Sequence, residues 1–146
     1  MKKIEFNIDI NADVQKVWDT MINLPTYKEW VGAGFPGSSY IGNWKKGENI
    51  RFVGAEGGGT LANIVELKPN EYIAAEHIAI LNNDNSEDRT SDLAKGWIGT
   101  TETYTFFKRN GGSKVRVEME INPEWENMFA DSWPKMLAKL KELSEN

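Results

Sequence analysis

The sequence predicts a single α+β domain of the helix-grip type, in which a curved antiparallel sheet of seven strands wraps around a long C-terminal helix. Apolar and polar residues alternate over residues 3–10, as in a strand with one buried face. Six further strand-like segments, separated by turns or loops, follow between residues 39 and 121. The C-terminal residues carry one long apolar stripe at helical spacing, so this helix can cover the apolar face of the sheet.

Composition narrows the range of functions. The 146 residues suit one domain, so we expect residues 1–146 to fold as one unit. The chain has no cysteine, which excludes disulfide bonds and thiolate sites. Its net charge is −5 and its basic residues are scattered, whereas nucleic-acid binding needs a basic stripe. No apolar run reaches the length of a membrane span, and no signal peptide is evident, so we expect a cytoplasmic protein without a membrane span.

Two short helices are predicted directly after the first strand. The inward side chains of that strand are Ile4, Phe6, Ile8 and Ile10. Asp13 has the short carboxylate that commonly caps a helix N-terminus, and apolar residues at helical spacing follow it. Pro25 ends this helix and can begin a second one over residues 25–30. The glycines of residues 31–38 predict a loop.

Most of the middle of the chain is predicted to form strands. They are predicted over residues 39–42, 49–55, 60–67, 71–81, 97–108 and 114–121. Residues 82–95 are polar and predict a long mobile loop. Asn110-Gly111-Gly112 predicts a hairpin turn, after which Val115, Val117, Met119 and Ile121 face inward.

The C-terminal segment is predicted to be helical. Pro123 can begin a first short helix, and Pro134 predicts a kink or a restart at Ser132, because a proline inside a helix removes a hydrogen bond. The apolar stripe that follows consists of Trp133, Met136, Leu137, Leu140 and Leu143.

Several short sequence motifs occur in a fixed order along the chain. They are Ala12-Asp13-Val14-Gln15-Lys16-Val17-Trp18, Tyr27-Lys28-Glu29-Trp30, Gly47 before a strand, Glu66-Leu67-Lys68-Pro69, and Trp133 through Lys141. In this order they resemble the SRPBCC superfamily of START-related and birch-pollen-allergen-like proteins, in its branch similar to the activator of the heat-shock protein 90 ATPase. Residues 72–77 and 97–104 are similar to a bacterial subgroup of that branch whose members are mostly uncharacterised.

The resemblance implies the helix-grip fold and a pocket between the sheet and the long helix. It fixes no activity, because one fold hosts many functions. The eukaryotic activator carries a separate N-terminal domain, for which this sequence has no counterpart before its first strand, so we expect chaperone activation less than pocket binding.

Ten residues form the predicted ligand pocket. They are Trp30, Phe35, Phe52, His77, Trp97, Glu102, Tyr104, Phe129, Trp133 and Met136. Large aromatic side chains line ligand pockets, and they equally fill cores, so tight packing without a cavity is the alternative.

Glu102, His77 and Tyr104 are the candidate catalytic residues. If Tyr104 points inward, the period of a strand also brings Glu102 inward, where burial would raise its pKa. The alternative is that a bulge turns Glu102 to solvent or that a basic residue pairs with it. His77, the only histidine, could act as acid or base, or it could simply be satisfied by a neighbouring group. Their strands are predicted to be neighbours, which leaves a His–Glu contact open.

Three functions compete at this point. The first is binding of a small hydrophobic or aromatic ligand without reaction. The second is a polyketide cyclase- or dehydratase-like enzyme, in which Glu102 and His77 move protons and Tyr104 donates a hydrogen bond. The third is a module that contacts a chaperone or another protein partner, or forms a homodimer. No motif predicts a cofactor, a metal site or a nucleophile, so the sequence favours binding over catalysis.

Overall fold

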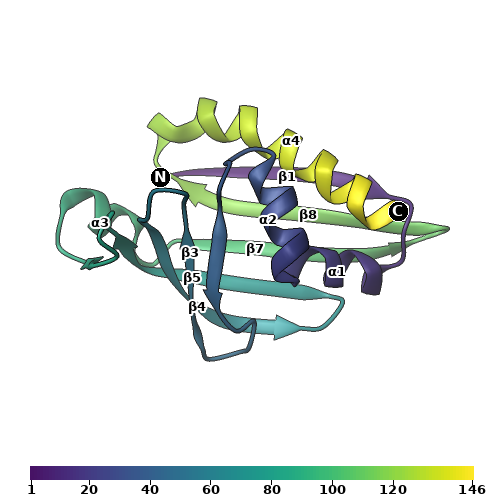
Figure 1. Ribbon diagram of the computed structural model, residues 1–146, viewed down its shortest axis with the longest axis horizontal. Helices are drawn as coiled ribbons and strands as arrows, with labels where there is room; N and C mark the ends of the chain where they lie inside the picture. Colours follow the sequence, from purple (N-terminus) through teal and green to yellow (C-terminus); the bar gives the residue numbers. More distant parts are fainter.

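A curved antiparallel sheet forms one side of the protein, and the C-terminal helix lies across its concave face (Figure 1). Figure 1 shows the computed structural model, which describes residues 1–146. The elements are β1 (Lys2–Ile10), α1 (Val14–Ile22), α2 (Leu24–Gly32), β2 (Ser39–Gly42), β3 (Asn49–Val53), β4 (Gly59–Lys68), β5 (Tyr72–Leu81), β6 (Glu87–Asp88), α3 (Asp92–Trp97), β7 (Thr101–Arg109), β8 (Gly112–Ile121), a 3₁₀ turn (Pro123–Trp125) and α4 (Glu126–Glu145).

The sheet has the strand order β1-β8-β7-β5-β4-β3-β2, with the two-residue β6 paired to β5. Every pairing is antiparallel. The predicted helix-grip fold and its seven principal strands are therefore confirmed. The first strand forms one edge of the sheet and pairs with the last strand, β8, so strands from opposite ends of the strand sequence are neighbours.

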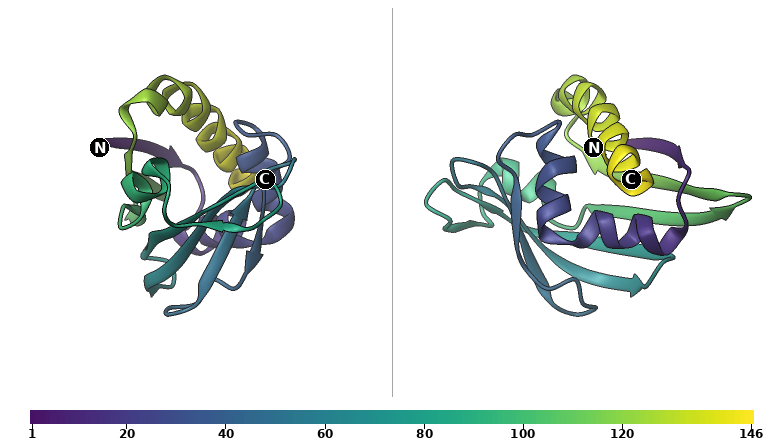
Figure 2. Two further views of the ribbon diagram at one scale, coloured as in Figure 1. Left: turned by 90° about the vertical axis from the view of Figure 1, so that its left-hand side faces the viewer. Right: turned by 45° about the vertical axis from the view of Figure 1, so that its right-hand side comes forward.

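The apolar layer between sheet and helices follows directly from the alternation in the strands. Phe6 of β1 lies opposite Val117 of β8, and both side chains point to the concave face. Helix α4 lies there, against β1 and against α1 and α2 (Figure 2). Its apolar stripe is buried in this contact. Leu140 and Val117 have no exposed surface, and Leu143 is half-buried at the end of the stripe.

The N-terminal helix pair forms as expected. The Asp13 carboxylate accepts a hydrogen bond from the Lys16 backbone N–H at 2.8 Å, which caps α1. Pro25 lies in the first turn of α2, where its missing N–H costs nothing. The predicted loop began too early, because α2 continues to Gly32, where a Cβ would meet no other atom within 4 Å.

The prediction of one long loop over residues 82–95 was wrong. The segment contains β6 and the short helix α3, whose N-cap is the Ser91 hydroxyl accepting from the Ala94 N–H at 3.1 Å. Asp88 holds this turn by accepting from the Ser91 hydroxyl and backbone. As a consequence Trp97 ends α3 instead of beginning a strand, and β7 starts at Thr101.

The predicted restart at Ser132 does not occur, since helical structure is continuous from Glu126 to Glu145. Pro134 and Ala130, whose carbonyl loses its helical N–H partner, are both exposed, so water can satisfy that carbonyl. Burial of Trp133 and Met136 on the opposite face stabilises the helix on both sides of the proline.

Replacing Leu140 by alanine tests the packing of α4 on the sheet. Because this side chain is fully buried, Leu140→Ala should reduce the free energy of unfolding by about 2–5 kcal/mol. Leu143→Ala, on the same helix but half-buried, should cost less than half as much. Urea denaturation of both variants measures this, and equal losses would contradict the described packing.

Candidate functional site

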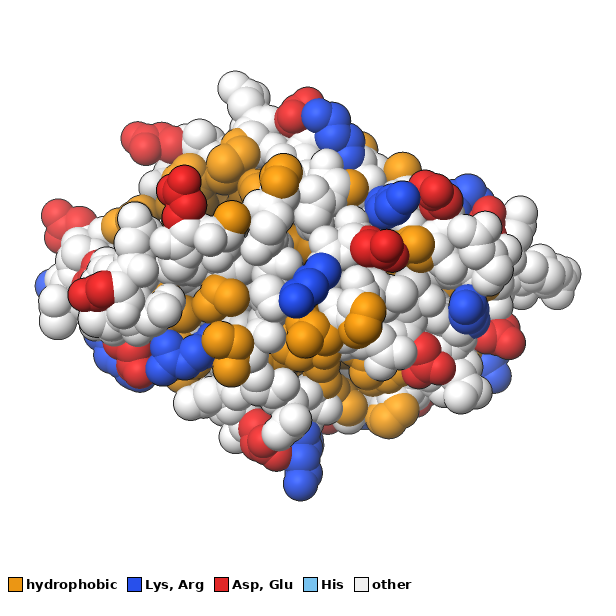
Figure 3. Space-filling view, in the orientation of Figure 1, with side chains coloured by type: hydrophobic (Ala, Val, Ile, Leu, Met, Phe, Trp, Pro, Cys, Tyr) orange, Lys and Arg blue, Asp and Glu red, His pale blue; other side chains and the backbone are white.

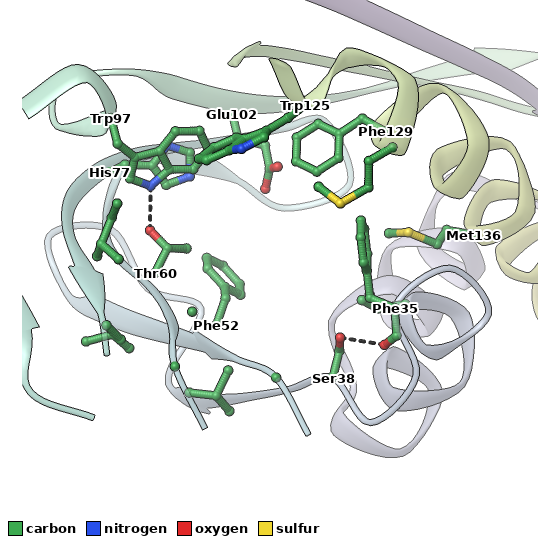
Figure 4. Close-up of a pocket in the computed structure, with 18 of the residues that line it drawn as sticks. Phe35, Ser38, Phe52, Thr60, His77, Trp97, Glu102, Trp125, Phe129 and Met136 are labelled. Atoms are coloured by element: carbon green, nitrogen blue, oxygen red, sulfur yellow. Dashed lines mark hydrogen bonds between the residues drawn. The ribbon is translucent and has the colours of Figure 1, made fainter. Parts of the chain in front are cut away.

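A cavity of about 510 Å³ lies between the N-terminal half of α4, helix α2 and the middle strands of the sheet (Figure 4). Its walls are mostly aromatic. Phe35 and Phe129 meet edge to face with ring centroids 5.9 Å apart, and Trp97 meets Trp125 at 5.4 Å in the same manner. The tight-packing alternative for these aromatic residues is therefore excluded, because an open space remains among them.

The structure brings all ten predicted pocket residues to the wall of this cavity. That they bind a ligand stays a prediction. Sequence reasoning missed other lining residues, among them Tyr27, Ser38, Thr60 and Trp125. Tyr27 could have been found, because it precedes Trp30 by three residues and therefore shares its face of α2. Thr60 and Trp125 carry no such signal.

Glu102 points into the cavity from β7 (Figure 4). Its Oε2 accepts a hydrogen bond from the Tyr104 hydroxyl at 2.6 Å, and its side chain has no basic partner. Burial raises the pKa of the Glu102 carboxyl, while the bond from Tyr104 opposes this rise. The bulge and the basic partner considered from the sequence are both absent at this position.

Glu102 affects the pKa of two neighbouring phenols. Burial, and then the negative charge of Glu102, raise the pKa of Tyr104 and of Tyr27. Both phenols therefore stay protonated across the physiological range. Tyr104 is committed to Glu102, whereas the Tyr27 hydroxyl has no partner within the protein.

His77 is almost completely buried at the end of the cavity, with 2 % of its surface exposed. Its ring stacks on Trp97 with centroids 4.0 Å apart. Burial lowers the pKa of His77 to about 4, so the ring is neutral at pH 7.

The hydrogen bonds around His77 indicate its tautomer. Its Nδ1 lies 3.0 Å from the Thr100 hydroxyl oxygen, and that hydroxyl donates its own proton to the Trp97 carbonyl at 2.6 Å. Thr100 must then accept from His77, so the proton is on Nδ1 and Nε2 carries a free lone pair. The structure thus supports the satisfied-histidine interpretation on one side of the ring.

The strands of His77 and Glu102, β5 and β7, are paired as predicted. Ala75 lies opposite Glu102 and Glu76 opposite Thr101. His77 continues this pairing, because its N–H donates to the Thr100 carbonyl at 2.9 Å. His77 and Glu102 are diagonal neighbours that do not hydrogen-bond to each other, so they form no proton-transfer pair in this structure.

The surroundings of the cavity show neither a metal cluster nor a basic stripe. No three His, Asp or Glu side chains come together as metal ligands would. On the face in Figure 3, blue Lys and Arg side chains are interspersed with red acidic ones. None of the helices combines the length and apolar character needed to cross a bilayer.

Residues 11–145 match the family described as Activator of Hsp90 ATPase homolog 1-like protein. The chain belongs to this family. This match confirms the resemblance of the sequence motifs to the heat-shock activator branch of the SRPBCC superfamily. No curated protein sequence matches the chain.

Solved structures of the same fold come from several bacteria. A protein from Mesorhizobium loti superposes with a TM-score of 0.74 at 14% identity, covering 97% of this chain and 96% of that one. The Aha1 dimer from Colwellia psychrerythraea gives 0.74 at 19%, covering 99% and 97%. A Staphylococcus epidermidis protein gives 0.72 at 18%, covering 97% and 88%. At such identities the likeness shows the fold alone.

Replacing Glu102 by glutamine should stabilise this family member at neutral pH. The folded protein holds the Glu102 proton more tightly than the unfolded chain, so the carboxyl lowers stability as the pH rises through its raised pKa, and costs nothing below about pH 4. Glu102→Gln should therefore raise the Tm by about 2–4 °C at pH 7–8, as for about 1 kcal/mol in a domain of this size. Scanning calorimetry against pH measures it.

The matched control is Glu29→Gln on the exposed side of α2, which should leave the Tm unchanged. A Glu102→Gln variant that melts lower than the unmodified protein at pH 8 would show that the carboxylate is stabilised by its surroundings.

Removing the only titrating imidazole should flatten the pH dependence of stability between pH 6.5 and 4. Because the folded-state pKa of His77 is about 4, the unfolded chain binds the proton first as the pH falls. This linkage lowers the free energy of unfolding by about 3 kcal/mol across that window. His77→Asn, which can still donate to Thr100, should remove this decrease in urea denaturation experiments, and an unchanged slope would refute the assignment.

Proposed function

We propose that the protein binds a small hydrophobic or aromatic molecule in the cavity between the sheet and α4, in the cytoplasm and without converting it. The cavity itself carries this proposal. Its volume of about 510 Å³ lies inside the range of about 300–1,000 Å³ that small-molecule sites occupy. Its wall combines aromatic rings with few polar groups, as in such sites.

The chemistry available in the cavity supports binding more than reaction. A proton-transfer enzyme needs an acid and a base that reach the same substrate atoms. His77 has a lowered pKa and is fixed by Thr100, and no nucleophile lies beside it. The second candidate, a cyclase- or dehydratase-like enzyme, draws on one observation, the Glu102 carboxyl of raised pKa beside the Tyr104 hydroxyl.

A protein-binding role is the third candidate, and the family description is what favours it. The solved Colwellia protein is a dimer, so a homodimer is the simplest partner to propose. Light scattering of the purified protein distinguishes monomer from dimer. A ligand role for the cavity does not depend on the outcome.

Filling the cavity tests the binding function. Ile80 lines the cavity, so Ile80→Trp should place a ring in it and weaken binding of the neutral naphthalene dye prodan at least about tenfold. Prodan fluorescence shifts to the blue in apolar surroundings, and titration of the unmodified protein should show this shift. Val65→Trp, at an exposed position of β4 outside the cavity, should bind within about twofold of the unmodified protein.

Two results would contradict the proposal. The first is equal prodan binding by the Ile80 and Val65 variants, which would place the dye elsewhere. The second is a flat response of the unmodified protein to prodan and to the ligands of the next section.

A further inference from the structure

The charged side chains of the cavity wall are of one sign only. Among the residues that line it, Glu102 is the only acidic side chain, and there is no Lys or Arg. His77 is neutral at pH 7 because burial lowers its pKa. A ligand with a carboxylate or phosphate would therefore meet a carboxyl and no compensating cation, and burying it there would be costly.

Two acceptor atoms in the cavity have no partner. The Tyr104 hydroxyl occupies Oε2 of Glu102, which leaves Oε1 without a hydrogen bond. The proton on Nδ1 of His77 leaves Nε2 as a lone-pair acceptor on a side chain that is 98 % buried and lines the cavity. As diagonal neighbours on one face of the sheet, the two side chains start about 7–8 Å apart.

The donors around these acceptors are mostly engaged within the protein. The indole N–H of Trp97 donates to the Thr60 hydroxyl at 2.8 Å, which Figure 4 draws as a dashed line. The indole N–H of Trp30 donates to the Met21 carbonyl at 3.0 Å. The Tyr27 phenol and the Trp125 and Trp133 indoles are the aromatic groups of the lining that donate to no protein atom. On the sheet side of the cavity, no side chain donates to Oε1 of Glu102 or to Nε2 of His77.

We propose that the cavity selects primary amines with an apolar body, bound as ammonium ions that donate to Glu102 and lie among the aromatic rings. The inference rests on the proposed binding function and narrows its ligand class. A charge-assisted hydrogen bond to a carboxylate is about twice as strong as a neutral one. Aromatic faces also attract a desolvated cation, and the rings of Tyr27, Tyr104 and Trp133 are close to this end of the cavity.

The test compares ligands of one shape and different head groups. Two sets serve: 1-naphthylmethylamine, 1-naphthylmethanol and 1-naphthoic acid, and octylamine, octanol and octanoic acid. Calorimetric titration at pH 8 should give a Kd for each amine at least about tenfold below that of its alcohol, with the acid weaker than the alcohol. Two sets are used because the cavity could exclude one of the two apolar groups by its shape alone.

Substitution at Glu102 separates the charge effect from general affinity. Glu102→Gln keeps the size of the side chain and removes its charge, so it should bring the amine to the affinity of the alcohol while the alcohol changes less than about twofold. Glu29→Gln, exposed on α2 and remote from the cavity wall, should retain the full preference for the amine.

The outcomes distinguish the ligand class from the binding function. Alcohols or acids that bind as tightly as the amines, or an amine preference that survives Glu102→Gln, would overturn the amine assignment and leave the binding function standing. No binding by any of the six compounds, together with a flat prodan titration, would overturn both.

Discussion

The position of Trp133 determines how the interior of this protein is divided. Its ring stacks on Phe6 of β1 at 6.0 Å, lies 6.0 Å from Trp30 of α2 and 6.4 Å from Tyr104 of β7. One side chain of α4 thus joins the sheet edge, the second helix and the central sheet. C-terminal to it, Leu137 and Leu140 pack into a solid core, and N-terminal to it the aromatic rings surround the cavity. Trp133 therefore separates the part of the interior that contains the cavity from the part that is densely packed.

The two halves of α4 differ in what lies beside them. Aliphatic side chains from β1 and β8 pack under the C-terminal half of α4, where Val115 is fully buried and Ile10 almost so. Beside the N-terminal half, rings such as Phe35 and Phe129 reach into the cavity without closing it. Interiors normally pack densely, so a space of this size among large side chains is a distinctive feature of this half of the protein.

The fold was predictable wherever one periodic signal extended over many residues. The alternation in residues 3–10 and 114–121 is strict because one face of each strand is buried, and its period also oriented Glu102 correctly relative to Tyr104. The segment from residue 82 to 97 was not predictable in this way, because α3 is a six-residue helix held by side chain to backbone bonds of Asp88 and Ser91. Such local bonds leave no periodic trace. The partner of His77 was hidden for the same reason, since Thr100 lies in the irregular connection after that helix.

The Glu102 side chain is difficult to explain as a structural element. It makes one hydrogen bond, has no cation beside it and pays the desolvation cost of an enclosed carboxyl. A glutamine could accept from Tyr104 equally well without that cost, and an apolar residue would extend the core. His77 follows the opposite pattern, because Thr100 and Trp97 satisfy and cover its ring and leave a single acceptor atom over. The proposed binding site resolves the contrast, since a donor that arrives with the ligand meets the free oxygen of Glu102 and replaces part of the hydration that the carboxyl has lost. The electrostatics that disfavour a carboxylate at this position then become the source of the selectivity of the cavity.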